Sequence, residues 1–147
     1  MDKYYQILNF VFRDADPAAL EYGIDFAKRI LLYIALAIGI IIILSLYRIF
    51  KKAGEKGFVA FIPIYNMIKL YKISGINPLF LLTFFIMFIP GIGSIGFMIW
   101  NIVDATQKAL LARRFGKQIG FIVGMILLDF IFYPILALDK SEYKENI

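Results

Sequence analysis

The chain has 147 residues, of which 61% are hydrophobic and 18% charged, and its mean hydropathy is +0.78. Soluble domains are only about half apolar, so this composition indicates a single integral membrane domain. Histidine and cysteine are absent, which excludes disulfides, thiolate nucleophiles and ordinary haem or zinc sites, and we expect no cofactor. A formal charge of +5 in so apolar a chain indicates the cytoplasmic edge of a membrane rather than nucleic acid.

An amphipathic segment and a long helix are predicted at the N-terminal end. Apolar side chains recur at helical spacing within residues 1–15, which places this segment on the external surface of the membrane. A helix over residues 17–52 should follow, since Asp16 can cap it and Pro17 suits its first position. Its apolar run at residues 30–46 reaches, with its flanks, the ~20 residues that cross a bilayer. A cleaved signal peptide fits this run poorly, because nearly thirty residues precede it and no small-residue cleavage site follows.

The distribution of charge predicts the orientation of this helix. The loop at residues 48–56 holds four bases against one acid, Glu55, whereas residues 1–29 hold five acids and four bases. Cytoplasmic segments carry an excess of Lys and Arg, so the loop is expected in the cytoplasm and the N-terminus outside. These features predict a protein of the cytoplasmic (inner) membrane.

Residues 57–74 are predicted to lie in the cytoplasmic interface without crossing the bilayer. A projection at 100° per residue separates two faces, with Asn66, Lys69 and Lys72 on one and Ile64, Met67, Ile68 and Tyr71 on the other. Pro63 can start this helix and Gly75 can end it. An amphipathic helix of this kind buries its apolar face in the membrane surface while lysine stems extend toward the headgroups.

A membrane hairpin is predicted over residues 78–115. Its parts are a first helix over 78–89, a turn at Pro90-Gly91, and a second helix over 95–115 that Ser94 can cap. The competing interpretation is one kinked span over residues 79–103 followed by an interfacial helix. We favour the hairpin because it keeps Arg113 and Arg114 on the same side of the membrane as the bases of residues 48–56.

The last apolar run, residues 119–138, is predicted to cross outward and to leave the tail, residues 139–147, outside. The whole chain, residues 1–147, is therefore predicted to be an all-α, multi-pass membrane bundle. It would have about four membrane segments, interfacial amphipathic helices and both termini outside.

Three short motifs resemble a known family in their order and spacing. They are KAGEKGFVAFIPIYN at residues 52–66, the pair Ile89-Pro90, and FGK at residues 115–117. Together they resemble a family of small bacterial multi-pass membrane proteins of unknown function, whose module also occurs ahead of the protease domain in some Bacteroidetes-type signal peptidases I. The resemblance covers roughly residues 48–138 and implies a multi-pass membrane module without established catalytic residues. Asp129 departs from the family's pattern, in which an apolar residue or proline is usual there.

Polar residues within the apolar segments form the candidate functional site. Asn101, Asp104 and Lys108 share one face of the second hairpin helix, and Asp129 lies near the middle of the last span. A charge at mid-bilayer costs at least ~2.5–3.5 kcal/mol, so Asp129 should be paired, protonated or in contact with water. Counted from the turn at Gly116, depth favours Asn101 over Lys108 as its partner. Two roles remain open, a structural pair and a route for ions or protons.

A second candidate site is a basic surface on the cytoplasmic side, formed by Lys51, Lys52, Lys69, Lys72, Arg113 and Arg114. Since none of the four serines has an activating neighbour in the sequence, we expect no enzymatic activity. The expected function is a non-enzymatic subunit or scaffold of a membrane protein complex. Its expected partners are the lipid bilayer and other membrane subunits or a second copy of the chain. The alternative is a homo-oligomeric ion or proton channel or transporter that uses the intramembrane aspartates.

Overall fold

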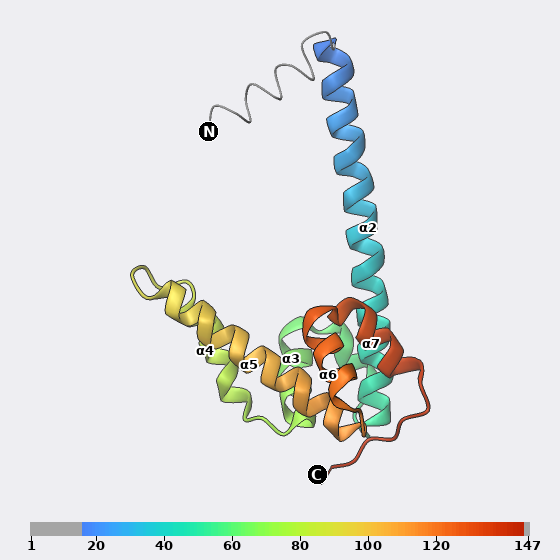
Figure 1. The fold of residues 1–147 in the computed structure, drawn as a ribbon, viewed down its shortest axis with the longest axis vertical. Coiled ribbons are helices and arrows are strands. Elements are labelled where there is room, and N and C mark those ends of the chain that lie inside the picture. The colour runs from blue at the N-terminus through green and yellow to red at the C-terminus, as the bar shows by residue number, and fades with distance from the viewer. Residues whose placement is uncertain (1–15, 146–147) are drawn as a thin grey trace. The chain divides into compact units, whose positions relative to one another are not determined.

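The computed structural model describes residues 16–145 and is shown in Figure 1. These residues contain helices and no strand, so the predicted all-α class is confirmed. In chain order the elements are α2 (Pro17–Lys52), η1 (Gly57–Phe61, a 3₁₀ helix), α3 (Pro63–Ser74), η2 (Pro78–Leu81, a 3₁₀ helix), α4 (Leu82–Ile86), α5 (Gly93–Arg114), α6 (Ile119–Leu127) and α7 (Asp129–Leu138). The amphipathic segment expected at residues 1–15 lies outside the described residues.

Helix α2 has the same bounds that the sequence indicates. The Asp16 side chain accepts a hydrogen bond from the backbone N–H of Ala18 at 3.1 Å, as a helix cap does. Lys51 and Lys52 lie in the last turn, where they complement the partial negative charge of the helix end. The 36 residues make a helix about 54 Å long. In the described part of the chain, it is the one helix that is long and apolar enough to cross a membrane.

The chain divides into two compact units, residues 1–38 and residues 39–147, and the division falls within α2. The second unit contains the hydrophobic core and every candidate site residue. Its core is built by the end of α2 together with η1, α3, α5, α6 and α7, and the fully buried side chains include Ile49, Phe50, Leu111, Met125 and Leu136. Each such side chain stabilises the fold by roughly 1.5–3 kcal/mol relative to an exposed one.

Helix α3 begins at Pro63 and is capped by Gly75, whose φ of 84° lies in the left-handed region that glycine adopts without strain. The helix packs on α5 through the buried side chains of Tyr71 and Ser74. Tyr71, which the helical projection assigns to the membrane-facing side, lies instead in the protein interior. Ile64, on the same projected side, stays 76% exposed.

Helices α4 and α5 form a hairpin, as the sequence favours (Figure 1). The rings of Phe84 and Trp100 meet edge to face at 5.2 Å, and Gly96 brings the backbones of the two helices close together. Gly91 makes the turn with φ of 88°. The first helix is shorter than the predicted 78–89: its first turn is the 3₁₀ helix η2, and α4 ends at Ile86. The Thr83 hydroxyl in α4 donates to the backbone carbonyl of Phe80 in η2 at 2.6 Å. Ser94 lies inside α5 rather than at its cap.

The segment predicted as the last span, residues 119–138, is not one continuous helix. The chain breaks at Leu128, with φ −135° and ψ 53°, into α6 and α7, which pack against each other through the rings of Phe121 and Phe132 at 4.9 Å. The Asp129 carboxylate accepts the N–H of Phe130 at 2.7 Å, a favourable place for an acid at a helix start. Gly124 allows the approach, because a Cβ there would overlap the Phe132 ring. At nine and ten residues, each helix covers about half of a ~30 Å hydrocarbon core.

Candidate functional site

Three of the four predicted polar residues meet around one ammonium group. The Nζ atom of Lys108 lies 2.8 Å from an Asp104 carboxylate oxygen and 2.9 Å from one of Asp129. Lys108 and Asp104 share a face of α5, one helical turn apart, whereas Asp129 arrives from the start of α7. We call these residues the Lys108 triad. Only 9% of Lys108 is exposed, so the two ion pairs form at the edge of the protein core.

The fourth predicted residue, Asn101, is not the partner of Asp129. Its side-chain amide donates to the backbone carbonyl of Phe97 at 2.7 Å, on its own helix. Asp104 lies ten residues before the end of α5 at Arg114, and Asp129 lies ten residues after the start of α6 at Ile119. The two aspartates therefore lie equally far along the chain from the turn that joins α5 to α6. Side chains on a helix slope toward its N-terminus, and this slope carries the Lys108 ammonium to the level of Asp104.

Sequence reasoning missed the polar groups that surround the triad. Gln107, beside Lys108 on α5, donates to the Ser74 hydroxyl of α3 at 2.8 Å, and Ser74 donates to the Leu70 carbonyl at 2.7 Å. Among the described residues, the buried Tyr71 hydroxyl has no hydrogen-bond partner. Burial, and after it the charge of Asp104, raises the pKa of Tyr71 to about 12, so the hydroxyl keeps its proton at neutral pH.

The triad contains one more carboxylate than ammonium groups, and 44% of the Asp129 side chain is exposed. Removing the lysine would leave two carboxylates near apolar helices, whereas the present arrangement gives each of them a charged donor. Within residues 16–145, no group of three or more acidic side chains is placed to hold a metal ion. The arrangement fixes α5 to α7.

A second charged cluster lies at the end of α7 and has Asp139 at its centre. Lys52 donates to the Asp139 carboxylate at 2.9 Å and to the backbone carbonyls of Leu136 and Asp139 at 2.8 Å, and Lys117 pairs with the other carboxylate oxygen. Ser141 donates to the same side chain. We call Lys52, Lys117, Asp139 and Ser141 the Asp139 cluster. It joins the end of α2, the turn before α6 and the tail, and no motif in the sequence pointed to it.

Contacts near this cluster also hold the tail. The tail is held at the same end of the second unit as the basic residues, since the N–H of Lys144 donates to the Arg114 carbonyl at 2.8 Å and the Arg114 guanidinium donates to the Tyr143 hydroxyl at 2.8 Å. The break at Leu128 precedes this tail, so residues 119–138 do not reach it as one continuous helix.

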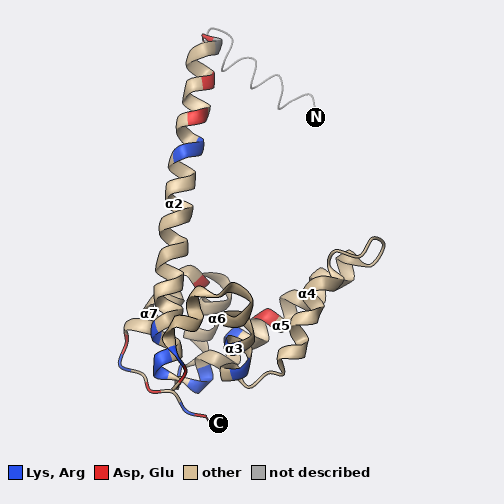
Figure 2. Ribbon diagram, turned by 180° about the vertical axis from the view of Figure 1, so that it is seen from behind, with Lys and Arg blue, Asp and Glu red and all other residues tan. Residues whose placement is uncertain are grey.

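Three of the six residues of the predicted basic surface form contacts within the protein. Lys52 and Arg114 contact the tail, and Lys69 is held by both carboxylate oxygens of Glu55, at 2.7 and 2.8 Å. The hydrogen bond and the charge of Glu55 raise the pKa of Lys69. The remaining members, Lys51, Lys72 and Arg113, are exposed. Figure 2 shows Lys and Arg gathered at the end of the second unit where the tail lies.

Replacing Asp139 with asparagine is expected to lower the Tm at pH 7 in mild detergent. Partial burial raises the pKa of Asp139, but the hydrogen bonds from Lys117, Ser141 and Lys52 outweigh it and hold the pKa well below its usual range. The carboxylate therefore contributes stability above the unfolded pKa of about 3.9, and this contribution is lost as the pH falls through the lower folded pKa. The loss at pH 7 should be roughly 2 kcal/mol, the size of a charged hydrogen bond.

The difference in Tm between the two proteins should shrink as the pH falls below about 4. Asp25→Asn is the matched control, because the Asp25 carboxylate pairs with Lys28 at 3.3 Å on an exposed part of α2. A difference in Tm that stayed constant between pH 7 and pH 3 would contradict the role of the Asp139 charge.

A model of a family of unknown function (DUF5684) matches residues 58–146. The match includes α3 to α7, and with them the whole Lys108 triad and all of the Asp139 cluster except Lys52. Neither the curated proteins nor the solved structures contain a match.

Proposed function

The chain belongs to the family of unknown function DUF5684, and we propose that it is a non-enzymatic subunit or scaffold of a complex in the cytoplasmic membrane. The observation that carries this proposal is the exposed surface of the α4–α5 hairpin. Large apolar side chains cover it on both helices and at the tip, among them Phe80, Phe85, Phe88, Ile92, Phe97, Met98 and Ile102. An apolar surface of this extent is characteristic of contact with lipid or with another protein.

We further propose a membrane arrangement with one crossing helix and two hairpins. Helix α2 crosses the bilayer, and the α4–α5 and α6–α7 hairpins enter from the basic side and return to it. This arrangement replaces the expected four spans and places the N-terminus outside but the tail in the cytoplasm. It is supported by the half-length of α6 and α7 and by the bonds that tie the tail to Lys52 and Arg114.

Single-cysteine labelling tests this arrangement, since the chain contains no cysteine of its own. Cysteines at the exposed positions Lys56, Gln118 and Glu145 should all be protected from a membrane-impermeant maleimide in intact cells and should react after permeabilisation. A cysteine at Tyr22 on α2 is the external control and should react in both conditions. If only the cysteine at position 145 were labelled from outside, residues 119–138 would cross the membrane, and this result would contradict the α6–α7 hairpin.

The absence of enzymatic activity is part of the same proposal. Ser45 donates to the Ile41 carbonyl at 2.6 Å. Ser74 donates to the Leu70 carbonyl and accepts a hydrogen bond from the Gln107 amide. These contacts support a structural role for both hydroxyls, because a nucleophilic serine needs a neighbouring base to accept its proton.

Photocrosslinking distinguishes a subunit from a protein that contacts lipid alone. A photoreactive phenylalanine analogue at Phe85 or Phe97 should give a discrete protein adduct in native membranes. The same analogue at the exposed Lys140 in the tail is the control and should not give that adduct. Mass measurement of the adduct separates a second copy of this chain from an unrelated subunit. If the hairpin positions crosslink only to lipid, the scaffold proposal fails.

The second candidate function is a homo-oligomeric ion or proton channel. It is supported by the extra carboxylate of the Lys108 triad and by the exposure of Asp129. One chain with a single long membrane helix cannot enclose a pore, so conduction would require several copies. Flux in liposomes that Asp129→Asn abolishes, with Tm unchanged, would favour this function over the scaffold.

A further inference from the structure

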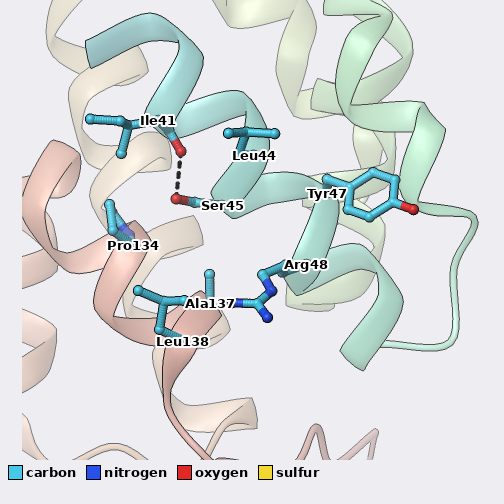
Figure 3. A pocket seen from close by; sticks show the side chains of 8 residues that line it. All are labelled: Ile41, Leu44, Ser45, Tyr47, Arg48, Pro134, Ala137 and Leu138. Atoms are coloured by element: carbon cyan, nitrogen blue, oxygen red, sulfur yellow. Dashed lines mark hydrogen bonds between the residues drawn. The ribbon is translucent and has the colours of Figure 1, made fainter. Parts of the chain in front are cut away.

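A surface groove runs between the end of α2 and helix α7, within residues 39–147 (Figure 3). Its volume is about 400 Å³, and its apolar walls are formed by Ile41, Leu44, Pro134, Ala137 and Leu138. The hydroxyl of Ser45 also borders the groove but donates to the Ile41 carbonyl at 2.6 Å, so its hydrogen-bonding capacity is used within the helix. A groove with such walls favours hydrocarbon over water.

The groove has a basic mouth. A second hollow of about 270 Å³ shares Arg48, Ala137 and Leu138 with it and adds Lys51, Lys52 and Asp139. Lys52 and Lys117 neutralise Asp139, as described above. Arg48 and Lys51 are exposed, and neither forms an ion pair with any residue in the range 16–145. The Lys51 ammonium lies 5.0 Å from the centre of the Tyr47 ring. Two positive charges are thus available where the apolar groove opens.

We propose that this α2–α7 groove binds one anionic phospholipid, with an acyl chain along the apolar walls and the phosphate between Arg48 and Lys51. The guanidinium of Arg48 supplies paired donors that match two phosphate oxygens, and Lys51 adds a point charge. The inference rests on the proposed membrane placement, which brings Arg48 and Lys51 to the headgroup level of the cytoplasmic leaflet.

Charge and shape together favour this occupant. A free phosphate would leave the 400 Å³ apolar groove unfilled, and a lipid of zero net charge would offset the two bases with its own cation. A helix from a partner would need a carboxylate at the mouth as well as apolar side chains along the walls. An anionic phospholipid carries both features in one molecule and is present in the bilayer around α2.

Native mass spectrometry of the full chain in mild detergent tests the proposal. Dioleoyl phosphatidylglycerol is titrated into the protein, and dioleoyl phosphatidylcholine serves as the comparison lipid. We expect one phosphatidylglycerol molecule to bind at least tenfold more tightly than phosphatidylcholine. The double variant Arg48→Gln/Lys51→Gln should lose this preference. The matched control Lys72→Gln/Arg113→Gln, which removes two exposed charges outside the groove, should keep it.

A variant of the wall tests the acyl chain separately. Leu44→Trp narrows the groove without changing charge and should also weaken phosphatidylglycerol binding, while Tm shows that the protein is folded. In addition, phosphatidylglycerol with a photoreactive group in its acyl chain should attach to residues 41–48 or 134–138. An equal loss of binding in both double variants would show general surface attraction and would overturn the proposal. Attachment confined to other segments, or a second copy of the chain found in the groove, would also overturn it.

A failure of the groove proposal can be told apart from a failure of the proposed membrane placement. Resistance of the protein to extraction from membranes by alkaline carbonate tests the membrane placement by itself. A protein that stays in the membrane but shows no lipid preference refutes the groove alone, whereas a protein that is extracted refutes the placement on which both depend.

Discussion

Replacing Lys108 with methionine is expected to cost about 3 kcal/mol of unfolding free energy. The substitution leaves Asp104 and Asp129 without the ammonium that lies 2.8 and 2.9 Å from their carboxylates. Breaking a buried pair from one side typically costs 3–5 kcal/mol, and the lower end applies because 44% of the Asp129 side chain is exposed. The measurement is the unfolding free energy in mild detergent, followed by circular dichroism during denaturant titration.

A triple variant separates the lost ion pairs from the lost lysine stem. Lys108→Met combined with Asp104→Asn and Asp129→Asn removes every charge of the triad and should recover most of the stability, since no carboxylate remains unpaired. If the single and triple variants were equally destabilised, packing of the lysine stem rather than charge would explain the effect. A single variant as stable as the wild type would show that the triad does not hold α5 to α7.

The second large effect is expected from Gly96→Val. A Cβ on Gly96 would lie 2.7 Å from the carbonyl carbon of Ile86 and from the backbone nitrogen of Met87, and backbone atoms cannot move aside as a flexible side chain can. The variant should force α4 away from α5 and cost at least roughly 1–3 kcal/mol, the usual price of overpacking. Trp100, the single tryptophan of the chain, contacts Phe84 across this hairpin, so its fluorescence spectrum reports the separation.

Gly120→Val provides the matched control. Gly120 lies in helix α6, and a Cβ there meets no atom within 4 Å, so the substitution should leave the Trp100 fluorescence unchanged. Unchanged fluorescence in Gly96→Val as well would mean that the two hairpin helices are not in close contact at this position.

The helix ends were predictable where the sequence contains a residue with a strong local preference. Asp16 and Pro17 locate the start of α2, and Pro63 and Gly75 locate both ends of α3. The turn between α4 and α5 likewise follows from Pro90 and Gly91, because neither residue continues a helix well. In these places local chemistry determines the structure.

The break at Leu128 has only a weak local signal, the acid Asp129 at the start of α7. Leucine is a good helix former, and Pro134, which would be the expected breaker, lies inside α7 instead. Two contacts accompany the break: the Asp129 carboxylate with Lys108, 21 positions earlier in the chain, and the Phe132 ring over Gly124 on the other side of the break. The partner of Asp129 was missed for the same reason, since the depth of Asp129 depends on where the apolar run at residues 119–138 bends. The Asp139 cluster was missed because it joins Lys52 to a residue 87 positions later.

The bond between Lys52 and Asp139 also constrains the order of biogenesis. In the proposed arrangement, α2 is made first and can enter the bilayer on its own, whereas the half-length helices α6 and α7 leave helix ends that only the folded protein satisfies. Asp139 follows both hairpins in the chain and binds back to Lys52 at the end of α2. This contact can therefore form only after both hairpins have been synthesised. Until then, α2 is the element that holds the hairpins at the membrane in the proposed arrangement.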